Sequence, residues 1–237
     1  MLVSLMTDSN DYAGSIELLD CMGSDLDVAN AARVSFGVEH SELTDRDVKL
    51  IKYLWDHKHS TPFEHCVLKF RIEVPMFIAK QHMRHRTWSY NEISRRYTSE
   101  NITMYSPSKF RQQASSNRQA STSNLVDPVI DIVAGERSSL EITATDCLKK
   151  NAEDSIKLYE ALLAKGICRE QARGILPQNT FTKYIATANL LNVLKFLALR
   201  DKPEAQYEMQ LLAKAMGTIV KEKFPVVFNS FNKVEEV

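Results

Sequence analysis

The chain has 237 residues, enough for one hydrophobic core of ordinary size, and we expect residues 1–237 to form a single domain. Its 30 basic and 30 acidic side chains give a formal net charge of zero, so no whole-chain field would attract a nucleic-acid backbone. This balance disfavours a general nucleic-acid-binding protein.

The cysteines and the N-terminus indicate a cytoplasmic protein. The four cysteines are scattered without a CxxC pair, which is typical of reduced thiols in a cytosol rather than of a disulfide framework. No apolar run approaches membrane-spanning length, and the start MLVSLMTDSNDYAG lacks the basic start and long apolar stretch of a signal peptide. We therefore expect no membrane partner.

The N-terminal part predicts short strands followed by helices. Strands are expected over 2–6 and 15–19, and a helix over 28–34. Thr44 is a candidate N-cap for an amphipathic helix, because apolar residues recur after it at helical spacing. Those residues are Val48, Ile51 and Leu54, and the helix runs through Trp55.

The next part predicts a half-buried strand over 66–74, where apolar and polar residues alternate. Pro75 suits the first position of a following helix. This helix should carry Gln81, Arg84 and His85 into a site.

The later elements follow from the same patterns. They are a strand over 101–105, a polar loop over 106–124, a helix over 136–165 stopped by Gly166, a strand over 181–186, a helix over 189–199 and a helix over 205–222 closed by Pro225. The polar loop has two interpretations, a mobile surface connection or a lid over a substrate.

Residues 84–97, RHRTWSYNEISRRY, should line a site because they contain only one aliphatic hydrocarbon side chain. Their four arginines imply an anionic ligand or an anionic protein surface, since a guanidinium fork suits phosphate and carboxylate. The spacing Ser89-x-x-Glu92 fits a capping box, which would place Glu92 to Arg96 in the first turns of a helix. A solvated charged helix with ordinary ion pairs is the alternative.

Two kinds of site find no support in the sequence. The seven glycines form neither GxGxxG nor GxxxxGK[ST], so a glycine-rich phosphate cradle is absent. Five of the six histidines fall between positions 57 and 85, yet there is no HExxH and no cysteine pair. We expect no metal site, and histidines that hydrogen-bond and stack instead.

The same segment resembles, without a mismatch, the signature of the flavin-dependent thymidylate synthases: Arg-His-Arg, two free positions, Ser, one free, Asn-Glu, one free, Ser, one free, Arg-Tyr. Weaker matches at 31–35, 60–65 and 168–173 extend the resemblance over about residues 28–225. It implies an α+β domain with a central, mostly antiparallel sheet flanked by long helices, assembled as a homotetramer whose flavin sites draw residues from several subunits.

The reaction implied by the resemblance is the reductive methylation of dUMP to dTMP. 5,10-Methylenetetrahydrofolate gives the carbon, FAD carries hydride and NADPH reduces the flavin. Each ligand is anionic, so the arginines have partners of suitable charge.

The resemblance also implies roles for individual residues. The catalytic residues are Arg200, placed against the uracil ring where it favours the N3-deprotonated base, and His59, close to the flavin ring. The dUMP-binding residues are Gln81, Arg84, Glu92, Ser94, Arg95, Arg96, Arg173 and Arg200. The FAD-binding residues are Thr61, Glu64, Arg84, His85, Arg86, Asn91, Glu92 and Asn189, and Lys195 is added to them as a substitute cation at a position that departs from the family.

Ser94 in a basic pocket raises the alternative of a nucleophilic serine. A nucleophilic serine needs an adjacent base, and Glu92 and Ser94, two residues apart on the expected helix, would not face each other. Substrate binding is therefore favoured. The flavin-independent synthases use a cysteine followed by histidine, and none of the four cysteines here precedes a histidine.

Some positions depart from the family pattern. Many relatives have arginine at the position of Leu191, asparagine at that of Lys195 and histidine at that of Glu204. Contacts to the adenine or phosphate end of FAD would then differ, with Lys195 as a substitute cation. The segment between Tyr105 and Arg173 is also longer than in compact members.

Two rival functions remain open at this point. The chain could be a nucleotide- or RNA-binding protein without catalysis, using arginine and aromatic side chains for phosphate contact and stacking. It could also be an FAD-dependent NADPH oxidoreductase without methyl transfer.

Overall fold

The computed structural model describes residues 1–115, 117, 120–133 and 139–232. Within these residues, a five-stranded antiparallel sheet forms the centre, in the order β1-β2-β3-β9-β4. Its strands are β1 (Leu2–Met6), β2 (Tyr12–Met22), β3 (Val67–Pro75), β9 (Phe181–Asn189) and β4 (Ser89–Glu92). The expected α+β class with a central antiparallel sheet is confirmed.

The two faces of the sheet differ because side chains alternate along each strand. β3 turns Leu68, Phe70, Ile72 and Val74, all 0% exposed, to one face. The opposite face carries cross-strand ion pairs, Arg71 to Glu17 at 2.5 Å and Lys183 to Glu73 at 3.4 Å. One face is thus core and the other is polar.

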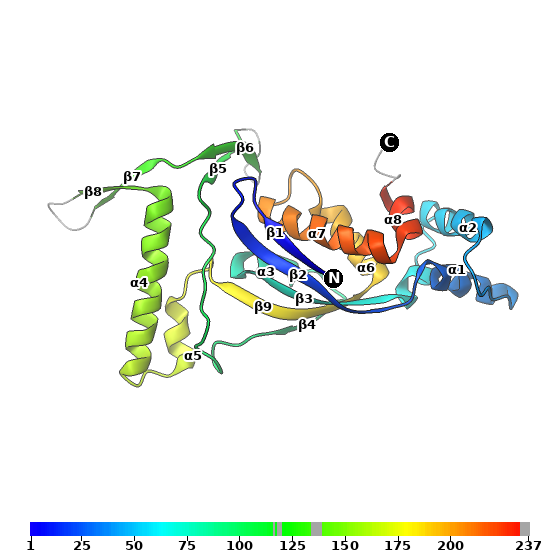
Figure 1. The fold of residues 1–237 in the computed structure, drawn as a ribbon, viewed down its shortest axis with the longest axis horizontal. Helices are drawn as coiled ribbons and strands as arrows, with labels where there is room; N and C mark the ends of the chain where they lie inside the picture. The colour runs from blue at the N-terminus through cyan, green and yellow to red at the C-terminus, as the bar shows by residue number, and fades with distance from the viewer. Residues whose placement is uncertain (116, 118–119, 134–138, 233–237) are drawn as a thin grey trace.

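The apolar face is covered by α6 (Leu190–Arg200) and α7 (Tyr207–Lys223), which lie along the sheet in Figure 1. At one end of the molecule α1 (Asp25–Arg33), α2 (Asp45–Asp56) and α8 (Pro225–Asn232) pack together (Figure 1). The short turns η1 (Val34–Phe36) and η2 (Thr61–His65) belong to this end.

The Thr44 cap is confirmed as a capping box with Asp47. Asp47 is fully buried and also accepts hydrogen bonds from Arg33, the nearer at 2.5 Å. Burial opposes ionisation of this carboxyl, but its bonds from Thr44, His40 and Arg33 hold its pKa below the usual range. Arg33, which lies in the weaker family match at 31–35, therefore links α1 to α2 through its bonds to Asp47.

An arm stands away from the sheet at the other end of the molecule (Figure 1). It contains the pair β5 (Phe110–Gln113) and β6 (Ser121–Val126), the pair β7 (Val129–Val133) and β8 (Ser139–Thr143), α4 (Ala144–Ala164), α5 (Arg169–Ala172) and η3 (Arg173–Ile175). In the described part of the chain, no helix has both the length and the apolar character that a membrane span requires.

Several expected elements were wrong in type or extent. The loop expected over 106–124 contains β5 and the start of β6, and 101–105 makes a single bridge, Met104 to Thr180, rather than a strand. The long helix begins only at Ala144, where the Thr143 side chain accepts from the amide of Asp146; residues 136–138 of that prediction lie outside the described residues.

The elements after β3 and near the C-terminus also differ from expectation. Pro75 ends β3 and precedes the helix α3 (Met76–His82), instead of occupying its first position. Pro225 starts α8, because two backbone amides of its first turn, Val226 and Val227, bond to the buried Asp25 carboxylate at 2.9 and 3.0 Å. This cap from a distant residue has no signal in the local sequence.

Candidate functional site

The capping box predicted at Ser89 and Glu92 is wrong, because residues 89–92 form the edge strand β4. Pairing with β9 places Ser89 and Asn91 opposite Thr187 and Ile185 on the polar face, and Tyr90 and Glu92 on the other. The Tyr90 hydroxyl donates to the carbonyl of His82 at 2.9 Å. The backbone hydrogen bonds between β4 and β9, together with the Tyr90 hydrogen bond, stabilise a strand here more than a local capping box would stabilise a helix start.

His82 is the buried centre of the segment before β4. Its side chain is 0% exposed, its Nδ1 lies 2.8 Å from the Tyr184 hydroxyl, and its ring centroid lies 4.7 Å from that of Trp88 and 4.8 Å from that of Phe196. Burial, then the charges of His85 and Arg200, lowers the pKa of His82 to about 3. The imidazole is neutral at neutral pH and serves packing.

Arg200 and His85 meet across 115 residues of sequence. Nε of Arg200, the last residue of α6, donates to Nε2 of His85 at 3.0 Å. His85 must accept here, so its proton lies on Nδ1. Burial and the Arg200 charge lower the pKa of His85 to about 4, which agrees with a neutral acceptor.

The guanidinium of Arg200 keeps its terminal nitrogens free of hydrogen bonds within the described residues. Burial and the neighbouring Arg84 charge lower the pKa of Arg200, although an arginine stays charged in proteins. Arg84 and Arg86 are exposed and have no ion-pair partner in the described part of the chain. This region therefore has unbalanced positive charge, which an anionic ligand would neutralise.

A second group of predicted residues lines a separate cavity of about 410 Å³. Glu92, Arg95 and Arg173 lie in its wall, together with Lys80. The Thr182 hydroxyl donates to Glu92 at 2.5 Å, which fixes the carboxylate. Three cations around one cavity suit an anionic ligand such as a phosphate.

The cavity cations differ in how firmly they are held. Arg95 donates to the carbonyls of Glu100 and Asn101 at 2.6 and 3.4 Å, and burial lowers its pKa. Nε of Arg173 donates to the Glu170 carbonyl at 3.3 Å. Lys80 was missed by sequence reasoning; its position directly before Gln81 on α3 was the available signal.

The other predicted dUMP residues lie nearby or apart. Ser94 and Arg96 follow β4 in a turn, where the Arg96 amide donates to Ser94 Oγ at 3.3 Å and the Arg96 guanidinium lies 3.9 Å from Glu170. Gln81, Arg84 and Arg200 are not among the residues that line the 410 Å³ cavity. One chain thus holds the predicted substrate residues in two places.

The predicted FAD residues are spread over the surface. His59, Thr61 and Glu64 are exposed at or beside η2, and the His59 ring contacts that of Tyr53 edge-on with centroids 5.9 Å apart. Asn189 caps α6, and its Oδ1 accepts a hydrogen bond from the backbone amide of Asn192 at 3.0 Å. This oxygen therefore stabilises the start of the helix.

Lys195 lines a further, mostly apolar cavity of about 360 Å³ with Ser60, Trp55, Phe63 and Leu191. Leu191 and Lys195, two positions expected to depart from the family pattern, therefore share one cavity wall. Among the described residues, no group of three or more histidine, cysteine, aspartate or glutamate side chains could hold a metal ion.

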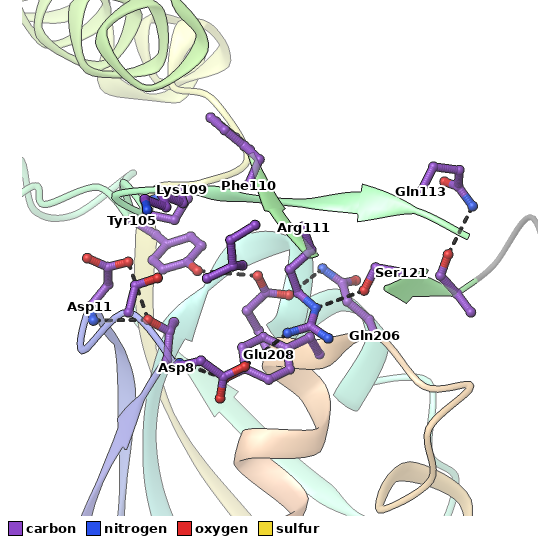
Figure 2. A pocket seen from close by; sticks show the side chains of 16 residues that line it. Asp8, Asp11, Tyr105, Lys109, Phe110, Arg111, Gln113, Ser121, Gln206 and Glu208 are labelled. Atoms are coloured by element: carbon purple, nitrogen blue, oxygen red, sulfur yellow. Dashed lines mark hydrogen bonds and ion pairs between the residues drawn. The ribbon is translucent and has the colours of Figure 1, made fainter. Parts of the chain in front are cut away.

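A third cavity, of about 260 Å³, lies between the turn after β1, β5 and the start of α7 (Figure 2). Arg111 bonds to Asp8 and to Ser121, each at 3.0 Å, and its guanidinium lies 4.2 Å from the centroid of the Tyr207 ring. The Arg111–Asp8 ion pair and the contact of Arg111 with Tyr207 join β5 to the turn after β1 and to the start of α7.

Comparisons with known proteins find relatives over most of the chain. The family model described as "Thymidylate synthase complementing protein" matches residues 17–226. A flavin-dependent thymidylate synthase of Thermus thermophilus is 40% identical over 220 residues, covering 93% of this chain and 76% of the relative. One from Thermosipho melanesiensis is 38% identical, covering 93% of this chain and 91% of the relative.

This chain belongs to the flavin-dependent thymidylate synthase family. Its fold also matches a solved UMP/dUMP methylase, PolB from Streptomyces cacaoi bound with 5-Br dUMP, with a TM-score of 0.76 and 31% identity over 98% of this chain and 97% of that one. A PolB structure bound with 5-Br UMP gives a TM-score of 0.74 at 30% identity over 92% and 93% of the two chains. Membership in the family is the prediction from residues 84–97, and it is confirmed.

Because His82 and His85 are neutral in the folded protein, we expect its unfolding free energy to decrease at acidic pH. Because the folded pKa values of His82 and His85, about 3 and 4, lie below the ordinary 6.5, their stabilisation is fully present above pH 6.5 and is lost progressively as pH falls from 6.5 to the folded values. The unfolding free energy of the wild type should fall between about pH 7 and about pH 4.5. In His82→Phe we expect this fall to be smaller by roughly 2 kcal/mol, because the titrating imidazole is absent.

Denaturant unfolding followed by circular dichroism at several pH values would measure this slope. His65→Phe, which changes an exposed histidine, is the matched control and should keep the wild-type slope. An unchanged slope in His82→Phe would show that this imidazole does not govern the acid response.

Proposed function

We propose that this chain catalyses the reductive methylation of dUMP to dTMP in the cytoplasm, with 5,10-methylenetetrahydrofolate as carbon donor, FAD as hydride carrier and NADPH as reductant. The observation that carries the proposal is membership in the family by a chain that keeps the whole segment 84–97. The structural similarity to methylases crystallised with 5-bromo nucleotides supports the choice of dUMP.

The donor set fits an anionic flavin nucleotide. Arg84 and Arg86 are exposed cations without ion-pair partners in the described chain, and Asn91 projects beside Ser89 on the polar sheet face. The proposed holders of FAD are Thr61, Glu64, Arg84, His85, Arg86, Asn91, Glu92, Asn189 and Lys195. Bound FAD would supply hydride transfer, which no amino-acid side chain can provide.

The protein side chains would bind and polarise dUMP. Lys80, Arg95 and Arg173 form the cationic cavity wall suited to its phosphate, with Ser94 and Arg96 in the turn after β4. Arg200 would hold a fixed positive charge against the uracil ring and stabilise negative charge there. The neutral His85 orients this guanidinium without competing for the anion.

We also propose a homotetramer that completes each site with residues from more than one chain. It is supported by the separation of Arg200 and His85 from the 410 Å³ cavity that Arg95 and Arg173 line. The polar sheet face, with exposed Lys69 and Arg71, is available for contact with another copy.

The first experiment is the visible spectrum of the purified protein, followed by anaerobic NADPH reduction with and without dUMP. We expect flavin absorbance that bleaches faster with dUMP, and dTMP when the folate is added. NADPH oxidation indifferent to dUMP would favour the oxidoreductase alternative. A colourless protein that takes up no FAD would favour the nucleotide-binding alternative.

Arg200→Ala should keep the fold and bound FAD but lose roughly 100-fold in turnover, because one preorganised donor is removed. Arg46→Ala, an exposed arginine on α2, is the matched control and should retain activity. Tritium release from labelled dUMP would measure turnover; near-normal turnover would remove Arg200 from the catalytic residues.

Shared sites predict complementation between two inactive variants. When Arg200→Ala and Arg173→Ala chains are co-expressed with different tags, about a quarter of the sites in randomly mixed tetramers should contain both arginines and regain activity. Turnover of the doubly purified assembly measures this. Inactive mixed assemblies, or an active monomer in sedimentation, would contradict the shared site.

A further inference from the structure

A line of four polar side chains connects α3 to the wall of the cavity in Figure 2. Gln81 Nε2 donates to Gln206 Oε1, and Gln206 Nε2 donates to Glu208 Oε2 at 3.0 Å. The other carboxylate oxygen, Oε1 of Glu208, accepts from the Tyr105 hydroxyl at 3.3 Å (Figure 2). Residues 81 and 206 are 125 positions apart, so only the tertiary fold creates this line.

The direction of the hydrogen bonds is set by the carboxylate. Burial, and then the Glu208 charge, raises the pKa of Tyr105, so its phenol stays protonated and donates. A carboxylate only accepts, so Gln206 must turn its NH₂ group toward Glu208. Its carbonyl oxygen then faces Gln81, which must donate in turn.

This direction of hydrogen bonding leaves one acceptor and one donor of the Gln81 amide free. Its Oε1 and its second amide hydrogen make no hydrogen bond to the described residues. A free primary amide could rotate by half a turn and exchange donor for acceptor, whereas the bond to Gln206 fixes which is which.

The geometry points to Gln206 as a positioning residue that, held by Glu208, fixes the amide of Gln81 for contact with the nucleotide. This inference rests on the proposed function, in which Gln81 contacts dUMP. Gln206 lies at the N-cap position of α7, yet its side chain makes no capping hydrogen bond. Its amide is therefore available for this task, and its loss leaves the helix start unchanged.

The test is a double-mutant cycle on the FAD-loaded protein, with dUMP affinity measured by isothermal titration calorimetry. Gln206→Met should raise the dUMP Kd by about tenfold, the size expected for one misoriented hydrogen bond. In a Gln81→Met background the same change should raise Kd less than about twofold, since Gln206 acts only through Gln81.

The controls separate positioning from general damage. Gln210→Met, one turn along α7, removes amide bonds to the carbonyls of Ala205 and Pro203 in the same loop, and should leave Kd unchanged. Glu208→Gln keeps the size of the side chain but can present either a donor or an acceptor to Gln206, so it should raise the dUMP Kd when Gln81 is intact. Melting temperatures identify any variant that loses its fold.

The outcomes distinguish this inference from the proposal it rests on. Wild-type protein that binds FAD but no dUMP would overturn both. Wild-type protein that binds dUMP, with Gln206→Met unchanged or with equal losses in the two backgrounds, would overturn only the positioning role. The positioning role is supported if Gln206→Met weakens dUMP binding only when Gln81 is intact.

Discussion

The pairing of β4 with β9 is the constraint on which the whole site depends. It converts residues 89–92 from a segment with a local helix-start pattern into a sheet edge, with alternate residues on opposite faces. The Tyr90 hydroxyl joins that edge to the carbonyl of His82 at the end of α3. A shift of β4 by one residue would exchange Asn91 and Glu92 between the faces and dismantle both groups of site residues.

The arrangement concentrates positive charge in a chain with no net charge. Arg84 lies near Arg200, and Lys80, Arg95 and Arg173 line the cavity beside Glu92. Arg95 and Arg200 are partly buried, whereas Lys80, Arg84 and Arg173 are exposed, and an anionic ligand would lower the free energy of such neighbouring like charges. His85 contributes by staying neutral beside Arg200, so it adds no further positive charge there.

The described arm and the turn after β1 supply support at a distance from the charged groups. Arg111, bonded to Asp8 and stacked on Tyr207, ties β5 to the start of α7. Glu208 and Gln206 line the same cavity, and their hydrogen bonds continue to Gln81 on α3. Structural interactions at the cavity in Figure 2 therefore reach a residue proposed to contact substrate.

The sequence by itself determined the family and most of the elements. Residues 84–97 matched the signature, alternation predicted β3 and helical spacing predicted α2, because these signals depend on neighbouring residues alone. The individual roles carried over from the family stay predictions. Only the tertiary structure decided that β4 is a strand, that Pro225 starts a helix on Asp25, and that Arg200 bonds to His85 and Gln81 to Gln206. Each of these depends on residues distant in sequence, where pairing and burial outweigh local preference.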